Sequence, residues 1–125
     1  MNFLLIDATT DKICFFSQFN NFSYNKTFES NKKNYDQFST LLFSFLKKNN
    51  IDLNLINHLF INQGPGNFSG LRVSIAVAKG LSITKKLDLY GFNSKDIKNV
   101  KYLDIISLFK KEIFKKNLIK PIYLS

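Results

Sequence analysis

The chain has 125 residues, 45% of them hydrophobic, and its 18 basic and 9 acidic side chains give it a formal net charge of +9. This length and apolar share predict one globular domain and exclude a disordered tail, while the single cysteine, Cys14, excludes a disulfide scaffold. No apolar run reaches the roughly 20 residues that a membrane helix needs, so we expect no membrane segment. Asp7 interrupts the first apolar stretch, so we expect no secretory signal. We therefore predict a cytoplasmic protein.

The first three predicted elements are strands. An apolar run at 3–8 ends in polar turn residues, and two aromatic-rich runs follow at 13–19 and 22–28. In the third run, Phe22 and Tyr24 alternate with polar residues, which is typical of an antiparallel strand with one solvated face. We therefore expect the chain to begin with a three-stranded meander.

Helices and strands alternate in the next part of the chain. Apolar residues recur at helical spacing across 34–48 and across 67–86. Short apolar runs at 55–61 and 87–92 are typical of strands.

The end of the chain predicts a further helix at 102–116 and, after Pro121, an edge strand at 122–124. The whole order is typical of an α/β or α+β protein with a mixed sheet and flanking helices, and we expect the α/β class.

Glycine is concentrated in one segment. Four of the chain's five glycines fall within 64–80, beside its only arginine, Arg72. Gly64, Pro65 and Gly66 join a predicted strand to a predicted helix, and we interpret them as a tight structural turn. A phosphate cradle at the helix N-terminus is the alternative. The spacing matches neither a P-loop nor a dinucleotide fingerprint, which favours the structural turn.

The predicted helix at 67–86 is apolar around most of its circumference. From 68 to 84 its only charged residues are Arg72 and Lys79, seven positions apart on one strip. A ridge of small residues at i, i+4 spacing consists of Gly70, Ser74, Ala78 and Ser82. Such a helix needs cover on more than one side, and a small ridge lets a second helix approach closely.

The helix at 34–48 is the expected neighbour of this helix. We predict that the pair forms a docking face for another subunit, and the alternative is that the two helices pack only on each other. The residues expected at the interface are Phe38, Leu42, Phe45, Gly70, Arg72, Ser74, Ala78 and Ser82.

The positive charge has two interpretations. Arg72 is the only arginine among the 18 basic residues, and most lysine pairs fall near predicted helix ends, where cations interact favourably with the helix dipole. This favours a solvated surface. A weak, salt-sensitive contact with RNA is the alternative.

Four segments together resemble a known family. The run from Gly64 to Leu81, GPGNFSGLRVSIAVAKGL, resembles the GPGSFTGLRIGIAxAKGLA signature of the TsaB (YeaZ) family, a subunit of the bacterial machinery for threonylcarbamoyladenosine in tRNA. Residues 5–10 resemble its LxIDTST start and 89–94 its PLxGVSS segment. Residues 121–125 resemble its closing PVYLR, with Ser125 in place of the arginine.

The resemblance implies a fold and a set of partners. It implies one actin/Hsp70-like (ASKHA, ribonuclease H-like) lobe at 1–94, with 95–125 as the remnant of a second lobe that typical members have in full. It also implies a non-catalytic subunit that docks on the catalytic TsaD subunit, with TsaE as a further partner, through helices corresponding to 34–48 and 67–86. Homodimers through the same surface are implied when the chain is alone, and any contact with tRNA is indirect or weak.

Candidate chemistry is sparse. Asp7, Thr9 and Thr10 resemble the phosphate-proximal turn of ATPases of this fold, although a carboxylate that caps its own turn is the favoured interpretation. The nucleotide cleft of such folds lies between two lobes, so we expect no cofactor except ATP and Mg²⁺ at the interface with the partner. His58 and Cys14 have no neighbours at ligand or activating positions, so we expect no metal site and no catalytic residue. The rival functions are a small ATPase that uses Asp7 and a basic tRNA-binding module.

Overall fold

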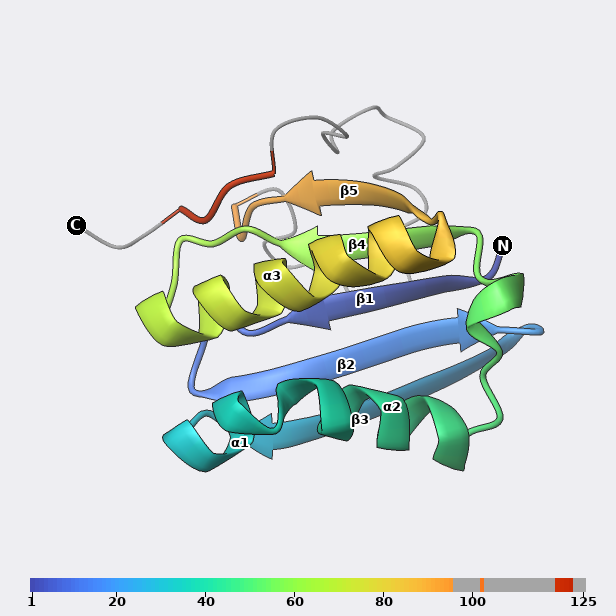
Figure 1. The fold of residues 1–125 in the computed structure, drawn as a ribbon, viewed down its shortest axis with the longest axis horizontal. Coiled ribbons are helices and arrows are strands. Elements are labelled where there is room, and N and C mark those ends of the chain that lie inside the picture. The colour runs from blue at the N-terminus through green and yellow to red at the C-terminus, as the bar shows by residue number, and fades with distance from the viewer. Residues whose placement is uncertain (96–101, 103–118, 123–125) are drawn as a thin grey trace.

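A computed structural model describes residues 1–95, 102 and 119–122. It contains one five-stranded sheet in the order β3-β2-β1-β4-β5, with all the described α-helices on one face (Figure 1). The predicted helix at 102–116 and strand at 122–124 fall almost wholly outside the described residues. The division into a lobe at 1–94 and a remnant at 95–125 therefore stays a prediction.

The predicted antiparallel meander is confirmed. It consists of β1 (Phe3–Asp7), β2 (Lys12–Phe19) and β3 (Phe22–Glu29), with each strand paired to the next. The connection between β2 and β3 is a two-residue turn in which Asn20 and Asn21 have φ angles of 51° and 69°. Asparagine tolerates positive φ, which suits a tight hairpin turn of this kind.

The second half of the sheet is parallel. Strand β4 (His58–Asn62) lies beside β1, β5 (Asp88–Phe92) lies beside β4, and α3 (Phe68–Lys85) makes the crossover between them. The predicted strand at 55–61 is wrong in its first part. Residues Leu53–Leu55 form the short 3-10 helix η1, so β4 begins only at His58.

The predicted helix at 34–48 is two helices. Helix α1 (Lys32–Asp36) begins after Asn31, whose side chain accepts a hydrogen bond from the Asn34 N–H. Helix α2 (Phe38–Lys48) follows after Gln37, whose φ of −107° and ψ of 18° interrupt the helical backbone. The hydrophobic periodicity continues across this break, so the sequence pattern does not indicate that one helix ends and another begins at Gln37.

Hydrogen bonds to nearby residues cap both ends of helix α3. The side chain of Asn67 accepts a hydrogen bond from the Gly70 N–H and so caps the start of the helix. At the other end Lys86 is left-handed, with a φ of 55°, and the Leu87 N–H bonds to the Ser82 carbonyl.

Two apolar clusters lie on opposite faces of the sheet. Leu4, Ile6 and their neighbours pack against α2 and α3 and form the main core. Phe3 and Leu5, which alternate with them on β1, face the other way into a second cluster with Phe60. Strand β1 is buried on both faces because it lies at the centre of the sheet.

Two glycines of α3 provide a matched test of this packing. A Cβ at Gly70 would overlap the carbonyl oxygen of Ala8, whereas a Cβ at Gly80 meets nothing within 4 Å. We expect Gly70→Ala to lower the free energy of unfolding by about 1–3 kcal/mol through overpacking. We expect Gly80→Ala to raise it by about 0.5–1 kcal/mol, because alanine is the better helix former. Urea denaturation measures both changes, and shifts of the same sign would contradict the packing of α3.

Candidate functional site

Asp7 is a buried carboxylate at the carboxyl end of β1, beside Asn62 at the end of the parallel strand β4. Its Oδ1 accepts hydrogen bonds from the Thr9 backbone N–H (3.1 Å) and hydroxyl (2.7 Å). Its Oδ2 accepts from the Asn62 side-chain amide (3.1 Å) and the Tyr102 hydroxyl (2.6 Å). Both oxygens are therefore satisfied by donors from within the chain.

Tyr102 is the residue that sequence reasoning missed at this site. It is 95 positions from Asp7, and no local motif connects them. Its ring packs on Phe16, with the ring centroids 5.7 Å apart. Burial, the negative charge of Asp7 and the hydrogen bond to Asp7 raise the pKa of Tyr102 well above its ordinary range. The hydroxyl therefore stays protonated and donates to Asp7.

Cys14 lies next to this cluster. Burial and then the negative charge of Asp7 raise the pKa of the Cys14 thiol to about 11. The thiol is the unreactive form of cysteine, so Cys14 is a poor nucleophile at neutral pH.

The Asp7 cluster does not fit a site for Mg²⁺ and a nucleotide. A carboxylate that holds a hydrated cation needs an oxygen lone pair that faces the ion or its water. Here each oxygen of Asp7 already accepts two hydrogen bonds from protein groups. Within the described part of the chain, no three His, Cys, Asp or Glu side chains form a group that could hold a metal ion. The cluster fits a structural link between β1, β4 and Tyr102.

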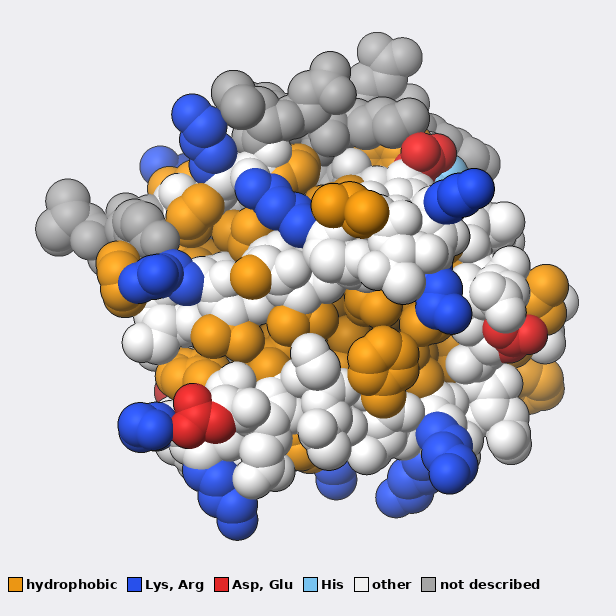
Figure 2. All heavy atoms as spheres, in the orientation of Figure 1, with side chains coloured by type: hydrophobic (Ala, Val, Ile, Leu, Met, Phe, Trp, Pro, Cys, Tyr) orange, Lys and Arg blue, Asp and Glu red, His pale blue; other side chains and the backbone are white. Residues whose placement is uncertain are grey.

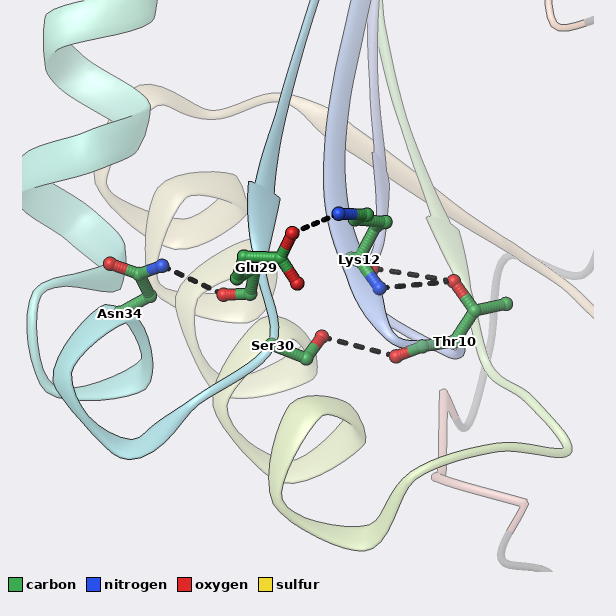
Figure 3. Close-up of polar contacts among 5 residues, drawn as sticks. All are labelled: Thr10, Lys12, Glu29, Ser30 and Asn34. Carbon is green, nitrogen blue, oxygen red and sulfur yellow. Dashed lines mark hydrogen bonds and ion pairs between the residues drawn. The ribbon is translucent and has the colours of Figure 1, made fainter.

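Thr10 belongs to a separate polar network (Figure 3). Its hydroxyl accepts a hydrogen bond from the Lys12 N–H (3.3 Å), and its carbonyl accepts one from the Ser30 hydroxyl (3.1 Å). Lys12 and Glu29 form an ion pair, and the Asn34 amide donates to the Glu29 carbonyl (2.7 Å). These contacts tie the turn after β1 to the end of β3 and to α1. Thr10 is not part of the Asp7 cluster.

The glycine turn is packed tightly against two other segments. Gly64 has a φ of 107° and its N–H bonds to the Asn62 side chain (2.9 Å). A Cβ at Gly64 would overlap the Ile122 carbonyl, and one at Gly66 would overlap the backbone of Thr9. These contacts support the interpretation of Gly64, Pro65 and Gly66 as a structural turn.

Most of the predicted interface residues belong to the chain's own core. Six are buried: Phe38, Leu42, Phe45, Gly70, Ser74 and Ala78. Arg72 is exposed and Ser82 is half-buried. The small ridge of α3 therefore faces the sheet, and these six residues are not available to a partner. Periodicity did not show this, because a helix that is apolar nearly all round does not reveal which side packs on its own sheet.

The open surface lies between and around α2 and α3 on their outer side. Phe43 is 46% exposed, Phe68 is 56% exposed and Ile83 is 79% exposed. Figure 2 shows a band of hydrophobic side chains between the two helices. A hollow along this band is lined by Ser39, Phe43, Ala76, Val77, Gly80, Leu81, Thr84 and Lys85. We call the surface formed by this hollow, Phe68, Arg72, Lys79 and Ile83 the α2/α3 face.

The chain is similar in sequence to proteins that are named for a modification of tRNA. The family model for TsaD, tRNA N6-adenosine threonylcarbamoyltransferase, matches residues 4–98. The tRNA threonylcarbamoyladenosine biosynthesis protein TsaB of Buchnera aphidicola subsp. Baizongia pistaciae is 46% identical over 43 residues, which cover 34% of this chain and 20% of that protein. TsaB of Escherichia coli is 30% identical over 95 residues, which cover 75% of this chain and 41% of that protein. The chain thus spans about two fifths of the length of the E. coli relative.

Two solved structures resemble the fold. YeaZ from Pseudomonas aeruginosa aligns with a TM-score of 0.67 at 16% identity, over 74% of this chain and 43% of that one. RuvC of T. thermophilus, in complex with a Holliday junction substrate, aligns with a TM-score of 0.55 at 7% identity, over 98% of this chain and 83% of that one. The YeaZ likeness, together with the mixed sheet and its flanking helices, confirms the predicted actin/ribonuclease H-like lobe. Of the described helices, none is long and apolar enough to cross a membrane.

The Asp7 cluster predicts a loss of stability when Tyr102 loses its hydroxyl. Tyr102→Phe leaves Oδ2 of buried Asp7 one donor short, so we expect the free energy of unfolding to fall by about 1–3 kcal/mol. Tyr24→Phe on β3 is the control, because the Tyr24 hydroxyl has no partner among the described residues, and we expect a change within about 0.5 kcal/mol. Urea denaturation of the two variants measures the difference. Equal effects would mean that Tyr102 does not support Asp7.

Cys14 predicts a pH profile for alkylation. Because its pKa is about 11, the thiolate is scarce at pH 8 and grows as the pH rises through that value. We expect iodoacetamide to alkylate Cys14 at pH 8 at least about tenfold more slowly in the folded chain than in the urea-unfolded chain. Mass spectrometry of timed samples gives both rates. Equal rates would show that the thiol is neither buried nor shifted.

Proposed function

We propose that this chain, which belongs to the TsaB (YeaZ) family, is a non-catalytic docking subunit in the biosynthesis of threonylcarbamoyladenosine in tRNA. The partner is a catalytic subunit of the TsaD type, and the contact is made by the α2/α3 face. The transfer reaction takes place on that partner. TsaE is a further candidate partner.

The single observation that carries this proposal is the open apolar surface of the α2/α3 face. Phe43, Phe68 and Ile83 are large hydrophobic side chains that stay 46–79% exposed, and Figure 2 shows a band of hydrophobic side chains between α2 and α3. Contiguous exposed apolar surface of this kind marks contact sites in soluble proteins. A partner that covers it removes apolar area from water, at about 25 cal/mol per Å².

The shape of the face suits a helix of the partner. The hollow between α2 and α3 is lined by small residues at Ala76 and Gly80, with Phe43 opposite them. The space around the Cβ position of Gly80 is empty to 4 Å. Small side chains let a helix approach closely, and bulky neighbours on either side then limit its orientation.

The Asp7 cluster supports a non-catalytic role for this chain. Both oxygens of Asp7 are occupied by the chain's own donors, and Cys14 holds its proton at neutral pH. These residues therefore favour an assembly function over the rival small ATPase. If ATP and Mg²⁺ take part, we expect them at the interface with the partner.

Substitution of the apolar anchors predicts loss of the complex. We expect Ile83→Asp and Phe43→Asp each to weaken binding to the catalytic subunit by about 30-fold or more, because each places a charge in a contact that excludes water. Phe22→Asp is the matched control, since Phe22 is 66% exposed but lies at the β2–β3 turn, away from the α2/α3 face. Isothermal titration calorimetry with the purified catalytic subunit gives the three affinities.

A functional measurement accompanies the binding measurement. In a reconstituted reaction we expect formation of threonylcarbamoyladenosine to fall with Ile83→Asp and to be restored by high concentrations of that variant, since only the affinity is changed. Full binding and full activity of both anchor variants would rule out the α2/α3 face as the docking site. Circular dichroism confirms that each variant is folded.

A further inference from the structure

We infer that the α2/α3 face recognises an acidic protein surface with an apolar centre, and that its charge opposes pairing with a second copy of this chain. The inference rests on the proposed function, because it specifies the chemistry of the partner at the same face. Helices α2 and α3 together carry five basic residues, Lys47, Lys48, Arg72, Lys79 and Lys85, and no acidic residue.

Three of the cations border the apolar hollows. Arg72 and Lys79 lie on the flank of α3 next to Pro121, where they line one hollow together. Lys85 lines the hollow that contains Phe43. A partner that covers the apolar centre therefore meets these charges at the edge of the contact.

Arg72 is held in a defined position at this edge. Its guanidinium lies over the exposed ring of Phe68, with the Cζ atom 5.3 Å from the ring centroid. This cation–π contact restrains the side chain while its donors stay open to solvent. A planar guanidinium restrained in this way is suited to a bidentate contact with a carboxylate.

The chain does not neutralise these charges within the residues that the structure describes. The two ion pairs there are Lys12–Glu29 and Lys32–Asp36, and neither involves α2 or α3. Asp52, the only acidic residue between positions 37 and 87, accepts a hydrogen bond from the Asn54 N–H at the start of η1. Figure 2 shows acidic side chains only at the margins of this view, with basic side chains around the hydrophobic band.

A second copy is a poor match for such a face. A two-fold contact brings the same patch together from both subunits, so cations on one copy face cations on the other. Like charges brought close together oppose association, and wrong partners are rejected in this way. The charge pattern therefore argues against the homodimer that the family resemblance implies.

RNA also matches the face less well than an acidic protein does. Phosphates would interact with Arg72 and Lys79, but the largest exposed side chains of the face are Phe43, Phe68 and Ile83. Ile83, the most exposed of the three, has no ring on which a base could stack and gains most from contact with other apolar groups. Only a protein surface supplies both apolar side chains and carboxylates.

The experiment measures association with the catalytic subunit as a function of salt. Stopped-flow or surface plasmon resonance data are collected from about 50 to about 500 mM NaCl, over which the Debye length falls from roughly 14 to 4 Å. We expect Arg72→Glu and Lys79→Glu each to lower the association rate constant at low salt by about five- to tenfold, and the difference to vanish at high salt. Lys33→Glu on α1 is the control with the same change of charge, because Lys33 does not line either of the two hollows described above.

Two further measurements test whether a second copy of the chain or tRNA binds to the α2/α3 face. Sedimentation velocity of the chain alone is expected to show a monomer at low salt, and titration with tRNA alone is expected to show no binding that depends on Arg72. A dimer at low salt that Ile83→Asp dissociates would overturn the inference. So would tRNA binding that Arg72→Glu abolishes while the association rate with the catalytic subunit stays unchanged.

The inference and the proposed function fail in different ways. If Ile83→Asp abolishes the complex but the charge reversals behave like Lys33→Glu, the docking site stands and its acidic partner surface is disproved. If Ile83→Asp and the charge reversals all leave binding unchanged, the docking site itself is disproved.

Discussion

The contact between Gly70 and the backbone of Ala8 determines how α3 is rotated on the sheet. Only a residue without a Cβ allows the helix to come so close to the end of β1. Ser74 and Ala78, which follow at i, i+4 spacing, are then buried against the sheet as well. At 100° per residue, Ile83 lies on the opposite side of the helix from Ser74 and points into solvent, where it is 79% exposed. The open face of the molecule is thus a consequence of where its smallest residues pack.

The Asp7 cluster and the α2/α3 face, which we propose as the docking site, lie in different parts of the fold. Parallel strands present their carboxyl ends at one edge of a sheet, where ligands commonly bind in α/β folds. In this chain Asp7 and Asn62 lie at that edge, but the Tyr102 hydroxyl completes the hydrogen bonding of Asp7. The polar groups that are gathered there support the fold. The proposed interaction involves the outer sides of α2 and α3 instead.

Charge and apolar surface act together on that face. In the complex that we propose, the exposed apolar side chains provide the free energy of association. The cations at the edge, which have no ion-pair partner among the described residues, affect the approach of a partner and the choice between partners. Five basic residues on two neighbouring helices, with no acidic residue among them, favour a partner of opposite charge over a copy of the same chain. A composition rich in lysine thus acquires a specific meaning once the positions of those lysines are known.

The amino-acid sequence by itself determined the elements of the fold and the family. Alternating and helical periodicities identified the meander, the two helical segments and the later strands, because burial imposes those periods on any chain. The run from Gly64 to Leu81 identified the family without any coordinates. It also predicted a structural turn at Gly64, Pro65 and Gly66, and Gly64 has a φ of 107°, which few other residues adopt.

Only the tertiary structure decided which residues face outward and which are joined across the chain. The six predicted interface residues that proved to be buried recur at helical spacing. In a helix that is apolar nearly all round, this spacing does not indicate which side packs against the sheet. The hydrogen bond between Asp7 and Tyr102 joins residues 95 positions apart, and local patterns cannot report such a contact. The sequence also did not indicate that β4 begins at His58, because a short apolar run fits a strand and a 3-10 turn equally well. Long-range packing settles each of these choices, and it does so through contacts that no single segment contains.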